Sequence, residues 1–345
     1  MQILIFILIL SVMIFVHEGG HFLIGKKNGI GVEEFNIGFG PKIFSRKSKG
    51  TEYSLRLLPL GGACIFEGFD GEESDSPSSF INASVWKRIS TVAAGPLMNF
   101  ILAFFLSIFV IGTIGYDTTA ISGTMEGFPA EEAGLKEGDK ILSLNGHPVT
   151  IYRDISMYLF FHEGESVRVA YRRNGERKET LIQPKYSPEE DRFYLGILGG
   201  ERVKGNALDT LRYSFSEVRY WVEITVRSLG MAFRGKVTKD DIAGPVGVAQ
   251  VVSDVYEESK PDGILVIWLN MLQLTILFSA DLGVMNLLPF PALDGGRLIF
   301  LLIEAVSGRA VDKRVEAGFH FVGMCCLMLL MVFVMYNDIS RVFGG

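Results

Sequence analysis

Charged side chains are absent from Met1 to Phe15, and cysteines are few along the whole chain of 345 residues. Of the three cysteines, Cys325 and Cys326 are neighbours and Cys64 is isolated, so we expect no disulfide framework and interpret them as small apolar residues. No tract of basic residues is present and the net charge is −6, which argues against a nucleic-acid partner.

The uncharged N-terminal stretch has no basic start and no small-residue cleavage pattern, so we expect a retained membrane span and not a signal peptide. Three further apolar runs follow at residues 89–115, 263–293 and 318–336. Each run is long enough to cross a hydrocarbon core of about 30 Å as a helix. The sequence therefore predicts an α-helical polytopic membrane protein with four spans in a lipid bilayer.

Lys and Arg are concentrated in two of the segments that join these spans. The first cluster lies between spans one and two and the second between spans three and four: Lys26, Lys27, Lys42, Arg46, Lys47, Lys49, Arg56, Lys87 and Arg88, then Arg297, Arg309, Lys313 and Arg314. The positive-inside rule makes both segments cytoplasmic. Both termini and the long central segment are then expected to be extracytoplasmic.

Two histidines and a glutamate interrupt the first apolar run, as His17, Glu18 and His21. Residues four positions apart share a face of a helix, so both imidazoles can reach one metal ion while Glu18 acts on a metal-bound water. This H-E-x-x-H pattern is the zinc-peptidase signature, although so short a pattern also occurs by chance. Ionisable groups at this membrane depth are costly, and we therefore favour a metal site.

The topology predicts where a third metal ligand should lie. Spans one and three cross the membrane in the same direction, so their C-terminal parts reach the same depth, and Asp294 ends the third run within Asn286 to Gly296. Pro289 and Pro291 break the helix there, and irregular backbone is tolerated at membrane depth where it lines a cavity. The alternative is that Asp294 caps the helix that follows it.

Other ionisable residues are weaker candidates for the third ligand. Asp281 is too deep to meet both histidines and is interpreted as a substrate contact or as a protonated, hydrogen-bonded group. His320 opens the fourth span and is expected at the interface. Glu304 is expected to snorkel or to pair with Arg297 or Arg309.

Between spans one and two, alternating apolar residues predict strands at 34–41 and 53–62. An edge strand near Leu55 could extend a substrate by strand addition, and a plain surface hairpin is an equal alternative from the sequence alone. Residues 71–79 are acidic and serine-rich, and we expect a loop there. Asn99, a lone amide in span two, is expected to satisfy an internal backbone group or cap another helix, or else to contact substrate.

Residues 116–186 alternate short helix, turn and strand, and they resemble a PDZ domain, a small α+β module. Asn145-Gly146 is a strong hairpin-turn signal within it. Because PDZ domains bind extended peptides by adding a strand, peptide ends are expected partners. Apolar residues then recur at helical spacing in 209–236, interleaved with arginines, which predicts an amphipathic helix on the outer membrane face. A second, shorter helix is expected at 246–258.

Four motifs, in this order, carry a resemblance to a known family. They are His17-Glu18-Gly19-Gly20-His21, Gly95-Pro96-Leu97-Met98-Asn99, Gly244-Pro245-Val246-Gly247 and the segment Asn286 to Gly296. The chain resembles the site-2 protease family of intramembrane zinc metalloproteases, specifically the bacterial regulator-of-sigma-E type. The resemblance implies one zinc ion per chain, held by His17, His21 and Asp294, with Glu18 as catalytic base.

Substrates of this family are membrane proteins cut within a transmembrane segment, such as anti-sigma factors or remnant signal peptides. The residues expected to contact such a substrate are Asn286, Asp281, Asn99 and Leu55. Two positions depart from the family pattern: Gly19 stands where a bulky apolar residue is usual, and Asp281 where an asparagine is usual. Many relatives also carry two PDZ modules, and one is found here.

The predicted protein is a multi-pass protease of the inner cell membrane with its active site near the cytoplasmic side. Two alternatives are a PDZ receptor or chaperone that keeps its metal without cleaving, and a metal transporter. The expected parts are span one at 1–24, a cytoplasmic β region at 25–90, span two at 91–115, the PDZ domain at 116–186, extracytoplasmic amphipathic helices at 187–262, span three at 263–296, a cytoplasmic loop at 297–314 and span four at 315–338.

Overall fold

The computed structural model describes residues 1–69, 76–238 and 243–343. The chain divides into two compact units, of which the first combines Met1–Ala103 with Leu229–Gly345 and the second is Phe104–Ser228. Most of the loop expected at 71–79 lies outside the described residues.

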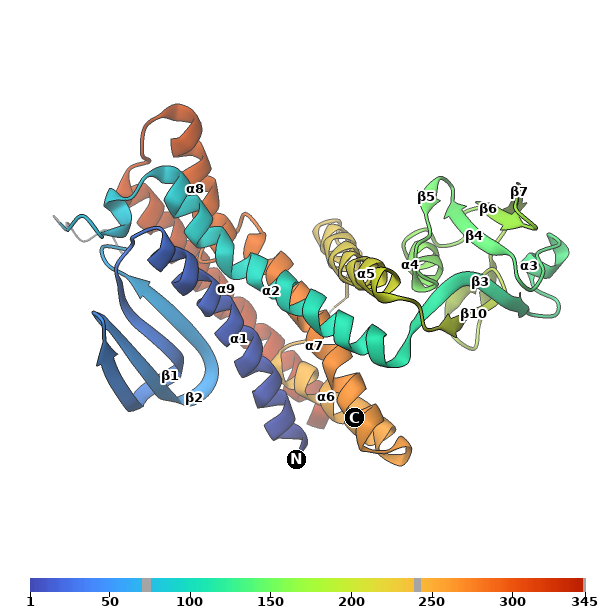
Figure 1. Cartoon of the computed structure of the whole chain (residues 1–345), viewed down its shortest axis with the longest axis horizontal. Coiled ribbons are helices and arrows are strands. Elements are labelled where there is room, and N and C mark those ends of the chain that lie inside the picture. The colour runs from blue at the N-terminus through green and yellow to red at the C-terminus, as the bar shows by residue number, and fades with distance from the viewer. Residues whose placement is uncertain (70–75, 239–242, 344–345) are drawn as a thin grey trace. The chain divides into compact units, whose positions relative to one another are not determined.

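Four helices in the described part of the chain are long and apolar enough to cross a membrane (Figure 1). They are α1 (Gln2–Lys27), α2 (Val85–Ile114), α7 (Ile264–Leu287) and α9 (Lys313–Phe343). Many of their apolar side chains are exposed, among them Leu4 and Leu8 of α1, as a surface in contact with lipid requires. The predicted four-span membrane protein therefore agrees with the structure.

A long antiparallel hairpin follows α1 and packs beside it (Figure 1). Its strands β1 (Val32–Ser48) and β2 (Thr51–Phe66) include the two predicted strands and continue beyond both. Shifts in register along the pair bend the ladder. The base of the hairpin is buried by Phe35 and Phe66, which fixes the start of β1 and the end of β2 against the helices.

Two shorter helices complete the first unit. Helix α6 (Pro245–Ser259) packs against α1 and α7, and its Val252 is fully buried among apolar residues of α1. Helix α8 (Asp294–Ser307) occupies much of the segment expected to be a cytoplasmic loop. That expectation rested on the charges of the segment and overlooked its helical spacing, which places Leu298 and Leu301 against the buried base of the hairpin. Short 3-10 turns cover Phe80–Asn82 and Lys260–Asp262.

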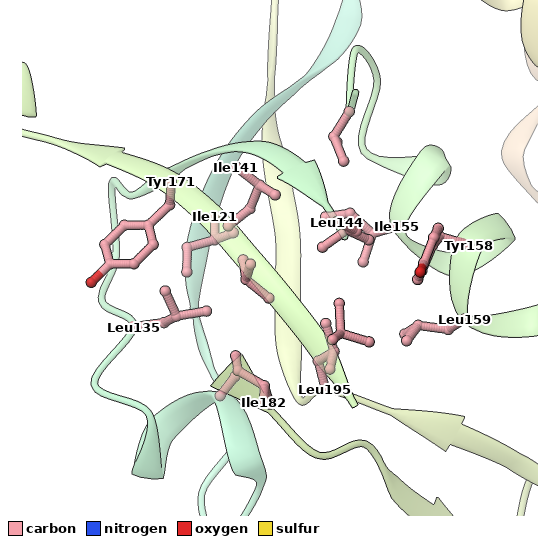
Figure 2. Packing of buried hydrophobic residues seen from close by; sticks show 14 residues of the cluster. Ile121, Leu135, Ile141, Leu144, Ile155, Tyr158, Leu159, Tyr171, Ile182 and Leu195 are labelled. Atoms are coloured by element: carbon pink, nitrogen blue, oxygen red, sulfur yellow. The ribbon is translucent and has the colours of Figure 1, made fainter. Parts of the chain in front are cut away.

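The second unit contains the small α+β module. Its sheet has the order β10-β3-β4-β6-β7, with β5 paired to β4. The elements are β3 (Tyr116–Thr124), α3 (Pro129–Glu132), β4 (Lys140–Leu144), β5 (His147–Pro148), α4 (Arg153–Phe161), β6 (Val167–Arg173), β7 (Glu176–Ile182), β8 (Lys185–Ser187), β9 (Arg192–Tyr194) and β10 (Ile197–Val203). Figure 2 shows the apolar core between this sheet and α4, which includes Ile141, Leu144, Ile155 and Tyr158.

The turn predicted at Asn145-Gly146 joins β4 to β5, and both residues have the positive φ that this turn type requires. The sheet continues past residue 186, the expected end of the module, because β10 returns to pair with β3. A pairing between strands so far apart in sequence leaves no local pattern from which it could be read.

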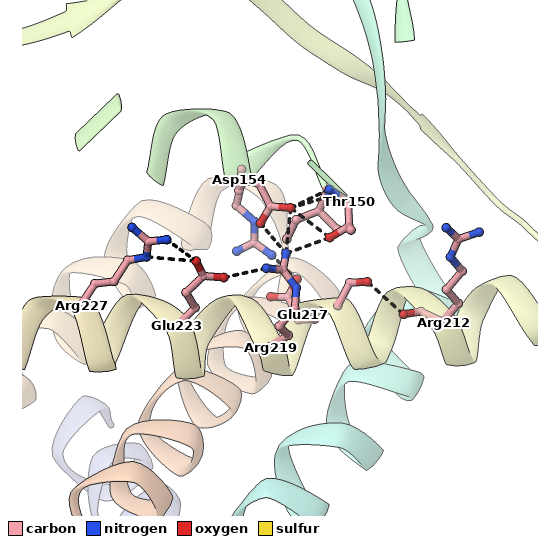
Figure 3. A network of polar contacts seen from close by, with 10 residues as sticks. Thr150, Asp154, Arg212, Glu217, Arg219, Glu223 and Arg227 are labelled. Carbon is pink, nitrogen blue, oxygen red and sulfur yellow. Dashed lines mark hydrogen bonds and ion pairs between the residues drawn. The ribbon is translucent and has the colours of Figure 1, made fainter. Parts of the chain in front are cut away.

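Helix α5 (Ala207–Phe233) is the predicted amphipathic helix, and within the second unit one of its faces packs against α4. Tyr220 of α5 contacts Ile151 and Met157 in an apolar cluster. Beside this cluster, Arg219 donates hydrogen bonds to Asp154, as Figure 3 shows, with Oδ1 at 2.7 Å. The arginines in this helix therefore serve protein contacts as well as a polar surface.

Candidate metal centre

The two histidines of α1 come together as their spacing predicts. One helical turn separates His17 from His21, their rings lie at 84° to each other, and their Nε2 atoms are 3.3 Å apart. Both side chains are buried. The helix therefore presents two imidazole nitrogens at one point.

Asp294 lies at the same point, although it is distant in sequence. Its Oδ2 atom is 3.2 Å from Nε2 of His17 and 3.3 Å from Nε2 of His21. The N-cap of α8 is Leu293, and Asp294 is the first residue within the helix, with its Oδ2 turned to the two histidines, so the alternative of Asp294 as the helix cap is not seen. The predicted grouping of Asp294 with His17 and His21 is therefore seen in the structure.

These three atoms have the spacing of zinc ligands. Bonds of about 2.0–2.1 Å from zinc to nitrogen or oxygen in a tetrahedral site place the ligand atoms roughly 3.3 Å apart. The observed separations of 3.2 to 3.3 Å match that value. Among the described residues, this is the one group of three or more His, Cys, Asp or Glu side chains that could hold a metal ion.

The rival ligands named from the sequence have other contacts. Nδ1 of His320 accepts a hydrogen bond from the backbone N–H of Ala292 at 3.0 Å. Glu304 forms a two-point ion pair with Arg88, a partner that was not among those expected for it. Both residues therefore serve the packing of α8 and α9 around the centre.

The loop before α8 positions Asp294 beside the two histidines. Pro289 and Pro291 end α7, and Ala292 adopts a φ of 70°, a left-handed conformation that costs energy for a residue with a Cβ. Gly295 approaches the end of α7 so closely that a Cβ on it would lie 2.1 Å from the carbonyl oxygen of Leu288. A tight return of the chain, open only to glycine at this position, therefore carries the third ligand.

Helix α2 contacts both histidines through their Nδ1 atoms. Nδ1 of His21 is 2.9 Å from the carbonyl oxygen of Thr91, and Nδ1 of His17 is 3.1 Å from the side-chain amide of Asn99. A Cβ on Gly95 would lie 2.2 Å from Nε2 of His21. The sequence singled out Asn99 but not Thr91, whose contact is made by a backbone carbonyl that every residue possesses.

Glu18 faces the hairpin beside the metal centre. Its Cγ lies close to Gly62 of β2, where an added Cβ would be 3.2 Å away. In the sequence of α1, Glu18 directly follows His17. The carboxylate therefore lies between the candidate ligands and the strand that could carry a substrate.

The residues expected to contact substrate are spread over three elements. Asn286 and Asp281 are half-buried on α7, and Leu55 on β2 is 44% exposed. Asn99 is fully buried, and its amide contacts the His17 ring, where a backbone group or a helix cap was expected. Substrate contact stays a prediction for all four.

Ionic contacts stiffen the hairpin around Leu55. Oε1 of Glu34 accepts hydrogen bonds from Ser54 at 2.5 Å and from Arg56 at 2.9 Å, and its other oxygen pairs with Lys42. Burial acts to raise the pKa of Glu34, but these three partners hold it below its ordinary value. The carboxylate therefore stays ionised and holds the two strands together where they bend.

The second unit has a groove of its own. It has a volume of about 420 Å³ and is lined by residues of α4, β9 and α5, including Phe160, Phe193 and Tyr220. Strand β10 is the edge strand of the described sheet next to β3. An edge strand can bind a peptide by strand addition, but the residues that line this groove come from α4, β9 and α5 and not from β10.

The chain is also similar to known proteins over nearly its whole length. The family model described as peptidase family M50 matches residues 5–330. Two proteins provisionally named zinc metalloproteases, one of Clostridium acetobutylicum and one of Fusobacterium nucleatum, are each 35% identical to the chain. The alignment with the first covers 98% of this chain and 97% of that protein, and the alignment with the second covers 100% of both. The regulator of sigma-W protease RasP of Bacillus subtilis is 30% identical, with 99% of both chains covered. Among solved structures, the PDZ domain of an SdrC-like protein of Listeria monocytogenes is 19% identical, covers 24% of this chain and 88% of its own, and has a TM-score of 0.22.

Proposed function

The chain belongs to peptidase family M50 and is a zinc metalloprotease of the site-2 type, and on this basis we propose which residues carry its chemistry. His17, His21 and Asp294 hold the zinc ion, and Glu18 is the general base. The observation that supports this most strongly is the triangle of ligand atoms with edges of 3.2 to 3.3 Å. Three protein ligands leave the fourth position open, as in catalytic zinc sites.

When bound, zinc supplies a Lewis acid and makes water acidic enough to act as a nucleophile near neutral pH. Glu18 takes the proton from the attacking water onto its carboxylate and returns it to the nitrogen of the leaving amine. Its position between the histidines and β2 supports this role, because a substrate lying along β2 would pass over the carboxylate.

The proposed substrate is a transmembrane segment of a membrane protein. Hydrogen bonds within a helix hide the scissile carbonyl, so the segment must unwind before it is cut. Strand β2 around Leu55 would hold the unwound backbone by strand addition, with Asn286 as an amide partner and Asp281 as a second polar contact. Anti-sigma factors are one candidate class, in keeping with the name of the Bacillus subtilis relative, and remnant signal peptides are another.

We also propose the orientation of the chain in the membrane. The Lys and Arg clusters between spans one and two and between spans three and four support a cytoplasmic position for those segments, with the termini and the PDZ-like module outside, in the inner cell membrane. The groove beside α4 would then take peptide ends of extracytoplasmic segments. Labelling of cysteines introduced singly into exposed positions of the second unit, in intact cells, tests this orientation.

A Glu18→Gln variant of the full chain in detergent tests the assignment of the base. We expect zinc to remain bound at one ion per chain while cleavage of a model transmembrane substrate is lost. Glu33→Gln, which changes an exposed carboxylate on β1, is the matched control and should cleave normally. Cleavage by Glu18→Gln at the parent rate would show that another group takes the proton, whereas a parent protein that binds zinc and never cleaves would support the receptor alternative.

A further inference from the structure

One face of α2 carries three residues at successive turns: Thr91, Gly95 and Asn99. We propose that this face fixes the tautomer and the orientation of both zinc-binding histidines, and that Asn99 is the positioning residue that accepts a hydrogen bond from Nδ1–H of His17. The inference rests on the assignment of His17 and His21 as zinc ligands. It adds to that assignment the groups that hold each imidazole in its ligating form.

The contact to His21 determines which of its nitrogens carries the proton. A carbonyl oxygen only accepts hydrogen bonds, so the 2.9 Å contact to Thr91 requires Nδ1 of His21 to be the donor. A neutral imidazole with its proton on Nδ1 has its lone pair on Nε2. Nε2 is the atom that faces His17 and Asp294, so the backbone of α2 selects the tautomer that can bind zinc.

The same argument applied to His17 determines how Asn99 must be oriented. Nε2 of His17 faces Asp294 at 3.2 Å, so the proton of a neutral, ligating His17 is on Nδ1 and needs an acceptor. In the structure the amide nitrogen of Asn99 faces Nδ1, and its Oδ1 is buried without a hydrogen-bond partner among the described residues. The two ends of an amide have nearly the same shape, and the hydrogen bond decides between them. Rotating the Asn99 amide by a half-turn about its Cβ–Cγ bond places the acceptor Oδ1 against Nδ1–H of His17. The contact between two donors, the amide nitrogen of Asn99 and Nδ1–H of His17, then becomes a hydrogen bond.

Close helix packing brings this face of α2 within reach of the histidines. A Cβ on Gly20 would lie 2.5 Å from the carbonyl oxygen of Ala94, and one on Gly95 would overlap the ring of His21. Small residues at such a contact let two membrane helices approach at backbone distance. Helix α7 also contacts α2, because Ser279 Oγ donates a hydrogen bond of 2.9 Å to the carbonyl oxygen of Asn99. Asn99 is thus held between the helices that carry the zinc ligands and the substrate contacts.

The test compares zinc dissociation constants of full-length variants in detergent, measured by competition with a chelator. Asn99→Leu removes the acceptor at similar volume, and we expect zinc to bind about 10- to 100-fold more weakly. Asn99→Asp restores an acceptor, and we expect affinity within a few-fold of the parent or tighter. Thr113→Ala is the control, because it removes a side-chain hydrogen bond to the backbone of the same helix, at Phe109, and touches neither histidine, so it should leave zinc affinity unchanged.

Two results would overturn the inference: parent-like affinity in Asn99→Leu, or equal losses in Asn99→Asp and Asn99→Leu. Equal losses in both variants would mean that the Asn99 side chain acts by donating a hydrogen bond or by its volume, and not by accepting a hydrogen bond from His17. Thermal unfolding of the zinc-free variants separates these outcomes from general loss of packing, because the inference requires Asn99→Leu and Asn99→Asp to differ in zinc affinity beyond any difference in melting temperature.

A double-mutant cycle with His17→Ala distinguishes this inference from the proposed function. If His17 binds zinc, His17→Ala weakens binding, and Asn99→Leu adds no further loss in that background. If His17→Ala leaves zinc affinity unchanged, the ligand assignment itself is wrong. A loss with His17→Ala together with full additivity of Asn99→Leu contradicts only the positioning role.

Discussion

The carboxylate of Asp338, near the end of α9, accepts a hydrogen bond of 2.8 Å from the backbone N–H of Gly247 in the first turn of α6. Its other oxygen accepts one of 3.1 Å from Gly244 N–H. The Asp338 side chain is fully buried. Both glycines are required by this approach, because a Cβ on Gly244 would lie 2.8 Å from Asp338 Oδ2 and one on Gly247 would lie 3.1 Å from Oδ1. The carboxylate thus satisfies free N–H groups at the helix start and complements the helix dipole.

Removal of this carboxylate should release α6. Asp338→Ala leaves two buried N–H groups without an acceptor, and each costs about 1–3 kcal/mol. We expect a lower melting temperature of the full chain in detergent and faster proteolysis within 245–259. Asp254→Ala, an exposed change on the same helix, is the control. Proteolysis of α6 at equal rates in Asp338→Ala and Asp254→Ala would contradict the proposed anchoring.

Gly95→Ala should disturb the metal centre directly. Its Cβ would lie 2.2 Å from Nε2 of His21, so the ring must leave its position or α2 must move away from α1. We expect a loss of zinc affinity of at least about tenfold, since misplaced ligand support typically costs 10- to 100-fold. Gly112→Ala on the same helix is the control, because no atom lies within 4 Å of the added methyl group. Chelator competition measures the zinc affinity of both variants. Equal affinities in Gly95→Ala and Gly112→Ala would show that α2 can shift to accommodate the methyl group without weakening zinc binding.

The grouping of the three proposed zinc ligands could be predicted from the sequence because it depends on simple geometry. His17 and His21 share a helix face through their spacing, and Asp294 follows from the direction and length of the spans. Contacts made by the backbone could not be predicted in this way. The carbonyl oxygen of Thr91 reaches His21 only because two glycines let α1 and α2 approach closely, and nothing local indicates which helices pair.

Elements that form local patterns were likewise predicted better than those that depend on distant partners. The strands of the β1–β2 hairpin and the turn at Asn145-Gly146 follow from alternation and turn chemistry. The pairing of β10 with β3 depends on a strand far away in the sequence, whereas the helical spacing of α8 was a local pattern overlooked among the charges of that segment. Glu304 shows the same limit, since its partner Arg88 is 216 positions away.

Gly19 departs from its family pattern, and its surroundings predict that the departure is not required for the fold. No atom lies within 4 Å of a Cβ placed on Gly19, whereas one on the neighbouring Gly20 would lie 2.5 Å from the carbonyl oxygen of Ala94. Glycine within a helix is less stable than alanine by roughly 0.5–1 kcal/mol. We therefore expect Gly19→Ala to raise the melting temperature and Gly20→Ala to lower it. A lower melting temperature in Gly19→Ala would mean that this position needs flexibility.

The stability of the second unit should depend on pH through Asp139. This buried carboxylate accepts hydrogen bonds from Arg173 at 2.6 and 2.7 Å and from the Lys136 N–H at 2.9 Å. Burial acts to raise the pKa of Asp139, but these partners hold it below its ordinary value. Because the folded pKa is lowered, the contribution to stability is complete above the unfolded pKa of about 3.9 and is lost as pH falls through the folded pKa.

Asp139→Asn removes this charge at all pH values. We expect the variant to be less stable than the parent by about 2 kcal/mol at pH 7, the scale of hydrogen bonds to a charged group, and the difference to shrink as pH falls below 4. Hydrogen exchange of amides in residues 104–228 of the full chain measures this. Glu137→Gln, an exposed change in the same loop, should follow the parent at every pH. A deficit in Asp139→Asn that stays constant down to pH 2 would show that the side chain acts by shape and neutral hydrogen bonding, because a contribution from its charge must disappear once the parent carboxylate is protonated.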